Sequence, residues 1–236
     1  MVMKIKELIE KVYLAELKEK EARLEALNAQ INPHFLFNTL DNINCIAHIE
    51  NVEIISNLTQ SLSGMLRYSI HSSMKNAIIE DELEHVRNYM YIIDVRFCGK
   101  IKYTEDVDPE LMDCKTIKLL LQPLVENAVQ HGIRKRLNCE GNIVIQGRIS
   151  DGAVEIQVKD DGVGMNQRNL KILQGVLEGR KEALEQFNPT RSGIGLKNVH
   201  DRVRLLFGEE WGMSIESLEG QGTTFFIKFP AQKNYT

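Results

Sequence analysis

The spacing of apolar residues along the chain changes near residue 100. Before that point, apolar side chains recur every three or four positions, which is typical of helices that bury one face. After it, short stretches alternate apolar and polar residues, which is typical of half-buried strands. The pattern therefore predicts an α+β protein, in which a helical region is followed by an α/β sandwich.

The helical region opens with residues 3–31, which are rich in Lys, Glu, Leu and Ala and contain no Gly or Pro. This composition favours a helix. Two heptad registers run through it without joining, so we expect a short or interrupted coiled coil. The alternative is one amphipathic helix packed on its own domain. Pro33 follows inside apparent helix and should bend the axis.

Three further helices are predicted before residue 100, each with one apolar row. His34 and Asn38 lie on a different, polar face of the first of them. Two such helices bury little alone, so we expect a dimer that makes four of them. The apolar rows are Leu36, Leu40, Ile43 and Ala47; then Ile55, Leu58, Leu62 and Met65 near 52–70; then Ile79, Leu83, Val86, Met90, Ile93 and Phe97.

Four strands are predicted beyond residue 100, and helices at about 112–131 and 195–207 lie between them. The turn Ser150-Asp151-Gly152 should join two of the strands in a hairpin. Residues 166–192 are polar and weakly periodic, which indicates a functional or mobile loop, although 170–186 could form a helix. The alternating positions are Ile101 and Tyr103; Ile143, Ile145 and Ile149; Val154, Ile156 and Val158; and Phe225, Ile227 and Phe229.

Composition excludes several classes of protein. The 236 residues carry a net charge of -4, so nucleic acid is not an expected partner. The four cysteines lack CxxC spacing and indicate reduced thiols, not a disulfide framework or a zinc site. No apolar run approaches the roughly 20 residues of a membrane span, so we expect this chain itself to be soluble.

Four polar segments could carry chemistry. Residues 160–165, DDGVGM, follow a predicted strand, and residues 192–196, SGIGL, open a predicted helix. Glycines allow the backbone to approach a ligand, an aspartate accepts hydrogen bonds from an amine, and amides at a helix start attract phosphate. Each segment alone fits a simpler interpretation equally well, namely a polar turn and a flexible loop that ends in a helix cap.

The other two segments are residues 121–132, LQPLVENAVQHG, and residues 220–224, GQGTT. On a helix, Asn127 and His131 are four apart and share a face, and an Asn oxygen is a suitable Mg²⁺ ligand. Glu126 borders that face. The alternative for each polar residue is a solvated helix face or a cap. The final segment is a turn that could place Thr223 near a nucleotide.

Taken together and in this order, the four segments resemble the N, G1 and G2 boxes and the final GxGT turn of the GHKL ATPase superfamily. The resemblance implies a Bergerat ATP-binding fold. It implies that Asp160 holds the adenine amine, that Asn127 binds Mg²⁺ and that Glu126 acts as general base or electrostatic partner. The remaining nucleotide-binding residues that it implies are His131, Gly162, Gly164, Gly193, Gly195, Leu196 and Thr223.

Residues 30–40, QINPHFLFNTL, resemble the phosphoacceptor segment of sensor histidine kinases of the YesM/LytS type. That resemblance implies autophosphorylation of His34 by ATP and transfer of the phosphoryl group to an Asp of a response regulator, within a homodimer. It also implies a longer protein, in which this chain is the cytoplasmic portion and membrane spans lie in an N-terminal sensor region. Asn38, one helical turn beyond His34, could orient the imidazole.

The implied organisation is a signalling helix at 1–30, phosphoacceptor helices at 31–75, and an ATP-binding domain at 76–236 with a lid at about 166–192. One position departs from the family: Gln130 stands where a Lys is common, so we expect weaker ATP binding. The sequence leaves open whether Arg134, Lys135 or Arg191 supplies the missing charge. Two other functions remain open, namely a GHKL ATPase or serine kinase acting on another target, and a degenerate scaffold that binds no nucleotide.

Overall fold

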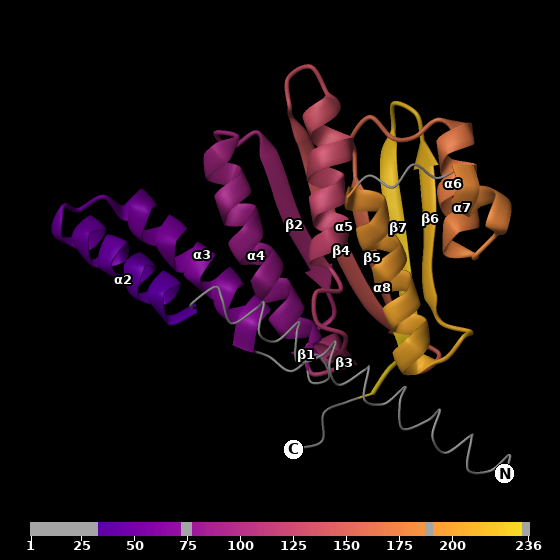
Figure 1. The fold of residues 1–236 in the computed structure, drawn as a ribbon, viewed down its shortest axis with the longest axis horizontal. Helices are drawn as coiled ribbons and strands as arrows, with labels where there is room; N and C mark the ends of the chain where they lie inside the picture. The colour runs from indigo at the N-terminus through magenta and orange to yellow at the C-terminus, as the bar shows by residue number, and fades with distance from the viewer. Residues whose placement is uncertain (1–32, 72–76, 187–190, 233–236) are drawn as a thin grey trace, which may run out of the picture. The chain divides into compact units, whose positions relative to one another are not determined.

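The computed structural model describes residues 33–71, 77–186 and 191–232 (Figure 1). The chain divides into two compact units, residues 1–60 and 61–236, and the boundary falls inside helix α3 (Glu53–His71). The coiled coil predicted for residues 3–31 lies outside the described residues. Within the described part of the chain, no helix combines the length and the apolar character that crossing a membrane requires.

The first unit contains α2 (Pro33–Ile49) and the start of α3. Leu40 and Ala47 are buried as predicted. Two other predicted core residues are not: Ile43 is 39% exposed and Ile55 is 42% exposed. Ser56 is buried instead, and its hydroxyl donates a hydrogen bond to Oδ1 of Asn44 on α2 at 2.6 Å. A single chain therefore leaves part of the predicted apolar rows uncovered.

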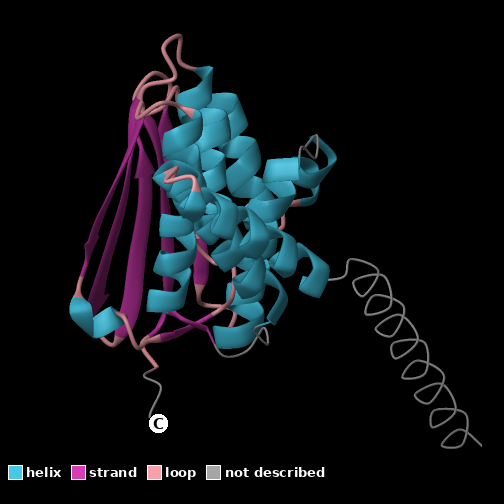
Figure 2. Ribbon diagram, turned by 90° about the vertical axis from the view of Figure 1, so that its left-hand side faces the viewer, coloured by secondary structure: helices cyan, strands magenta, loops and turns pink. Residues whose placement is uncertain are grey.

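The second unit is built on a five-stranded sheet with the order β2-β4-β5-β7-β6. The pair β2–β4 is parallel, and the other neighbours are antiparallel. Figure 2 shows the strands as one layer with one face open, so the predicted α/β sandwich is confirmed. The bounds are β2 Ile101–Val107, β4 Gly141–Ser150, β5 Ala153–Asp160, β6 Gly212–Leu218 and β7 Gly222–Pro230.

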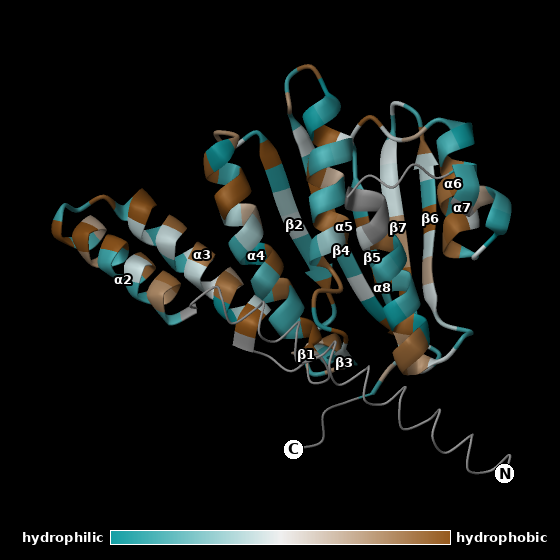
Figure 3. Cartoon of the chain, viewed as in Figure 1, coloured by the Kyte–Doolittle hydropathy of each residue, from teal (hydrophilic) through white to brown (hydrophobic). Residues whose placement is uncertain are grey.

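Helices cover the other face of this sheet, and the core lies between the two layers. Each of these helices carries both hydrophobic and hydrophilic residues (Figure 3), as expected for elements that bury only one side. Phe225 and Phe229 on β7 are the largest fully buried side chains. The helices of this unit are α4 Ile79–Arg96, α5 Gln122–Asn127, α6 Gln167–Leu177, α7 Lys181–Gln186 and α8 Arg191–Phe207, with a short 3₁₀ helix η1 at Pro109–Leu111.

The strands β4 and β5 form the predicted hairpin. Ser150 pairs with Ala153, so Asp151 and Gly152 make the two-residue turn. Both have positive φ, 50° and 75°, which is the conformation of a type I′ turn. Asp and Gly are among the few residues that adopt this conformation readily, so the turn and the register of the hairpin follow from local sequence.

The edge strand β6 was not predicted from the sequence. Side chains of the helical layer form hydrogen bonds with main-chain groups on the outer side of this strand. His200 on α8 accepts a hydrogen bond from the amide of Met213 at 3.0 Å, and Gln174 on α6 donates to the carbonyl of Ile215 at 3.1 Å. These hydrogen bonds occupy main-chain groups that could otherwise pair with a strand of another molecule.

The helix predicted for residues 112–131 is wrong in its first half. Residues 115–116 form β3, which pairs with β1 (Ala77–Ile78), and α5 starts only at Gln122, with Pro123 in its first turn. Proline suits that position because it has no amide hydrogen to satisfy. Beyond Asn127 the helix widens into a π-helical turn, η2 (Ala128–Gly132), and then tightens into a 3₁₀ turn, η3 (Ile133–Lys135).

Candidate functional site

A pocket of about 460 Å³ opens in the second unit between α5, η2 and η3 on one side and the ends of β5 and β7 on the other. Its volume lies within the range of small-ligand sites. The pocket gathers residues from all four of the sequence segments, and helix α6 completes its wall. The predicted residues that line it are Asn127, His131, Asp160, Gly164, Leu196 and Thr223.

Asp160 is the last residue of β5 and is only 2% exposed. Burial raises the pKa of its carboxyl to about 6, although the amide of Gly162, which donates to Oδ1 at 2.8 Å, opposes that rise. At neutral pH the group is therefore mostly a carboxylate with free acceptor capacity. A buried acceptor at the base of a pocket is suited to an amine of the ligand.

Glycines allow three segments to close around this carboxylate. A Cβ atom on Gly132 would lie 2.5 Å from Oδ1 of Asp160, and a Cβ atom on Gly162 would lie 2.3 Å from the carbonyl carbon of Gly132. Gly164 has φ +65°, and its Cβ would lie 2.0 Å from the carbonyl oxygen of Leu218. These three glycines therefore let segments 121–132 and 160–165 and the end of β6 pack tightly at the base of the pocket.

The two predicted glycines of the third segment behave differently. A Cβ atom on Gly195 would meet nothing closer than Cβ of Pro123 at 3.8 Å, so this position has room for a side chain. Gly193 lies in the first turn of α8. Gly195 is not among the described residues that line the pocket, whereas its neighbour Leu196 is buried and does line it.

Asn127 and His131 point into the pocket from the helix that begins at α5. Asn127 is 8% exposed, and its side-chain amide has no hydrogen-bond partner within the described residues. Burial, and then the charges of Lys135 and Arg134, lower the pKa of His131, which is therefore neutral at pH 7. The pocket thus offers an uncommitted amide oxygen and an uncharged imidazole on one side.

Glu126 is half-buried beside the pocket but does not line it. Its carboxylate accepts a hydrogen bond from Nε2 of Gln122 at 2.7 Å, and Oε1 of Gln122 in turn meets Nε2 of the buried His85. Sequence reasoning gave no role to Gln122 or His85. They are 37 residues apart, and no spacing rule connects them.

His34 and Asn38 belong to the first unit and are both exposed on α2. The side-chain nitrogen of Asn38 lies 3.3 Å from Nδ1 of His34, one helical turn away. The predicted pair is therefore within hydrogen-bond distance, and the imidazole is open to solvent.

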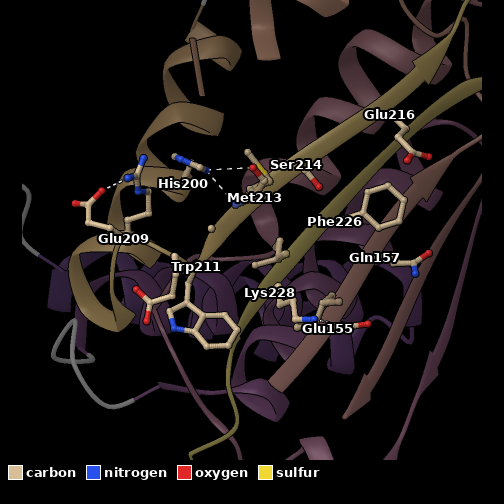
Figure 4. Close-up of a pocket in the computed structure, with 15 residues that line it drawn as sticks. Glu155, Gln157, His200, Glu209, Trp211, Met213, Ser214, Glu216, Phe226 and Lys228 are labelled. Carbon is tan, nitrogen blue, oxygen red and sulfur yellow. Dashed lines mark hydrogen bonds and ion pairs between the residues drawn. The ribbon is translucent and has the colours of Figure 1, made fainter. Parts of the chain in front are cut away.

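A second hollow, of about 580 Å³, lies at the edge strand β6 (Figure 4). Trp211 and Phe226 form its apolar wall, and four glutamates surround it. The two cations of this wall already have partners: Arg204 pairs with Glu209, and Lys228 pairs with Glu155 at 2.5 Å. Because the remaining charge is negative, this hollow is unsuited to a polyphosphate.

Two family models match the chain. Residues 22–101 match the histidine kinase family, and residues 112–233 match the family described as histidine kinase-, DNA gyrase B-, and HSP90-like ATPase. The second match contains every pocket residue named above and assigns an ATP-binding fold to that part of the chain.

Individual relatives agree with these matches. The sensor histidine kinase YesM of Bacillus subtilis is 39% identical over 98% of this chain and 37% of that protein. The sensor protein LytS of Oceanobacillus iheyensis is 32% identical over 88% of this chain and 34% of that protein. Among solved structures, a histidine kinase domain from Erythrobacter litoralis matches with a TM-score of 0.48 and 15% identity, covering 85% of this chain and 94% of that one.

The chain spans little more than a third of the length of the two curated relatives. The ATPase family match covers more than half of the chain itself. The chain therefore belongs to the family of histidine kinase-, DNA gyrase B- and HSP90-like ATPases, and its curated relatives are sensor kinases of the YesM and LytS kind.

Proposed function

We propose that this chain binds Mg-ATP in the pocket around Asp160, phosphorylates its own His34, and passes the phosphoryl group to an Asp of a response regulator. The observation that carries the proposal is the buried Asp160 carboxylate, held by the amide of Gly162 at the base of a 460 Å³ pocket that Asn127 also lines. The geometry fits a ligand with an amine at one end and phosphates at the other.

In this arrangement Asp160 accepts a hydrogen bond from the exocyclic amine of adenine. Apolar side chains of the same pocket, among them Met165, Leu173 and Phe225, flank the base. The phosphates then lie toward Asn127 and His131. The free amide oxygen of Asn127 suits Mg²⁺, which prefers few protein ligands and takes phosphate oxygens and water for the rest. When bound, the ion neutralises charge on the phosphate oxygens.

The acceptor chemistry is that of a neutral imidazole. A ring nitrogen of His34 attacks the γ-phosphorus, the bond from that phosphorus to the bridging oxygen breaks, and ADP leaves. An N–P bond forms, and the proton that the ring loses passes to Glu126 or to water. In the reacting state, Nδ1–H of His34 donates to the amide oxygen of Asn38. The Nε2 lone pair is then directed outward.

A homodimer is part of the proposal. Phe35, Ile46 and Ile49 on α2 are more than half exposed in a single chain, and an apolar surface of this kind is characteristic of an interface. Pairing the first unit with its copy would cover these side chains in a four-helix arrangement. The dimer would also cover the outward-facing Ile43 and Ile55.

The test is incubation of the purified chain with γ-labelled ATP and Mg²⁺. We expect acid-labile, base-stable label on the wild-type protein and none on His34→Gln, whose ATP affinity should be unchanged. Label transfer to a receiver domain would then show the second step. ATP turnover that survives in His34→Gln would favour an ATPase or a kinase for another target. Failure of the wild-type protein to bind nucleotide would favour a scaffold.

A further inference from the structure

The pocket needs a positive charge that the N-box position does not supply. Family resemblance places a Lys at position 130, where this chain has Gln130. That side chain is exposed and does not line the pocket. A bound triphosphate carries about four negative charges, and proteins usually meet such charge with Lys or Arg.

The charged residues that line the pocket are few. Asp160 and Glu219 are acidic, and His131 is neutral at pH 7. Lys135 is the one Lys or Arg side chain that lines the pocket among the described residues. Within the described lining, the charge that a triphosphate requires can therefore come from this ammonium alone.

The neighbouring Arg134 and Arg136 are not placed to bind the phosphates. Arg136 is paired with Asp161 at 3.2 Å and also donates to the carbonyl of Glu140 at 2.9 Å. Arg134 is exposed and does not line the pocket. Lys135 itself has no hydrogen bond or ion pair within the described part of the chain, so its ammonium is uncommitted.

Lys135 lies on the same side of the helical segment as Asn127 and His131. Asn127, His131 and Lys135 follow one another at intervals of four, and all three line the pocket although the backbone passes through a π turn and a 3₁₀ turn. Such π turns are frequent at functional sites. The long, flexible stem of Lys135 lets its ammonium follow the terminal phosphates.

We propose that Lys135 is the phosphate-binding cation of this pocket and supplies the charge that position 130 lacks. The inference rests on the proposed function and adds to it a residue that distinguishes nucleotides by their phosphates. Lys135 should favour ATP over ADP and leave adenosine binding unaffected. Arg134 is the matched control, because its charge also lowers the pKa of His131 but its side chain does not line the pocket.

The experiment is calorimetric titration of the wild-type chain, Lys135→Ala, Lys135→Arg, Arg134→Ala and Gln130→Lys with ATP, ADP and adenosine in the presence of Mg²⁺. We expect Lys135→Ala to weaken ATP binding about 10- to 100-fold, ADP binding less, and adenosine binding not at all. Lys135→Arg should keep most of the ATP affinity, and Arg134→Ala and Gln130→Lys should bind ATP as the wild type does.

Several results would overturn the inference. ATP binding by Lys135→Ala that equals wild type would do so, as would an equal loss of adenosine binding, which would indicate a damaged pocket. Tighter ATP binding by Gln130→Lys would return the role to position 130. A second readout needs no nucleotide: the pKa of His131, followed by NMR, should rise in Lys135→Ala. If the wild-type chain bound no ATP at all, the proposed function itself would fail, and the inference with it.

Discussion

The side-chain amide of Gln122 donates a hydrogen bond of 2.7 Å to the carboxylate of Glu126, one helical turn further along α5. A carboxylate only accepts, so the amide nitrogen must face Glu126 and the amide oxygen must face His85. His85 must then carry its proton on Nε2. His85 therefore donates to Gln122, and Gln122 donates to Glu126. These two hydrogen bonds hold the Glu126 carboxylate beside the pocket.

This arrangement makes Gln122 a positioning residue for Glu126. In Gln122→Leu, we expect the rate of His34 phosphorylation to fall about tenfold, while the affinity for ATP stays within about twofold of wild type. Glu126→Gln should show a similar or larger loss of rate. Gln122→Leu removes the orientation of the carboxylate, and Glu126→Gln removes the carboxylate itself. Because the two changes affect the same group, the double variant should be no slower than Glu126→Gln alone. Additive losses would mean that Gln122 acts by another route.

The pKa of Asp160 predicts a pH dependence of ATP binding. Since protonation removes the acceptor that holds the adenine amine, affinity should fall as the pH is lowered through about 6. Titrations of ATP between pH 5 and 8 measure this. Asp160→Asn should bind ATP weakly at every pH in that range, and an unchanged affinity in this variant would exclude the adenine-binding role.

The same residue should make the ligand-free protein less stable at neutral pH. The folded-state pKa is raised above the ordinary value near 3.8, so this contribution to stability is greatest below about pH 4 and is lost as the pH rises to about 6. The cost at pH 7 is on the order of 2–3 kcal/mol. Asp160→Asn should therefore raise Tm at pH 7 without ligand, with less effect at pH 4, in thermal unfolding followed by circular dichroism.

The glycines that the resemblance assigned to the nucleotide site should differ sharply in their tolerance of a methyl group. Gly164→Ala adds a Cβ 2.0 Å from the carbonyl oxygen of Leu218 at φ +65°, so we expect a loss of about 2–4 kcal/mol in the free energy of unfolding. Gly195→Ala is the control, because its Cβ has room and it lies inside α8. That variant should be neutral or up to about 1 kcal/mol more stable, as measured by urea unfolding.

A buried carboxylate anchors the segment that leads into α5. Glu82 is fully buried and accepts hydrogen bonds from the amides of Leu119, Leu120 and Leu121 at 2.6, 2.6 and 2.9 Å, and from the hydroxyl of Tyr68 at 2.5 Å. Glu82→Ala would leave three buried amides unpaired, so we expect a loss of about 3–5 kcal/mol. Tyr68→Phe removes one donor and should cost about 1 kcal/mol. Equal losses in the two variants would contradict this account.

Local patterns predicted much of the fold. Alternating residues gave four of the five strands of the sheet, and the Asp151-Gly152 turn fixed one register, because both features depend only on neighbouring residues. The alternation at Met213 and Ile215 in β6 is short and lies between glycines and glutamates, which hid the strand. Leu119, Leu120 and Leu121 looked helical because they are apolar, yet Leu119 has φ +56° and the segment is held by Glu82.

Some residues of the candidate site could likewise be predicted from local sequence, and others could not. Asp160 and its glycines lie in a compact motif and could be predicted from it. The hydrogen bond from His85 to Gln122 joins residues far apart in sequence, so it depends on how α4 packs against α5. The orientation of Lys135 depends on two irregular helical turns that residue spacing does not encode. Sequence left Arg134, Lys135 and Arg191 open at the phosphate end. Of the two whose side chains the structure describes, Arg134 and Lys135, Lys135 lines the pocket.

The side chains that bond to the edge strand β6 also limit how copies of this protein can aggregate. An incoming β-segment would have to break the bonds of His200 to Met213 and of Gln174 to Ile215 before it gained any main-chain bond of its own. Edge-to-edge pairing of sheets from two molecules, which can start a fibril, is therefore opposed at β6. The sheet edge of this domain is thereby protected against unwanted aggregation.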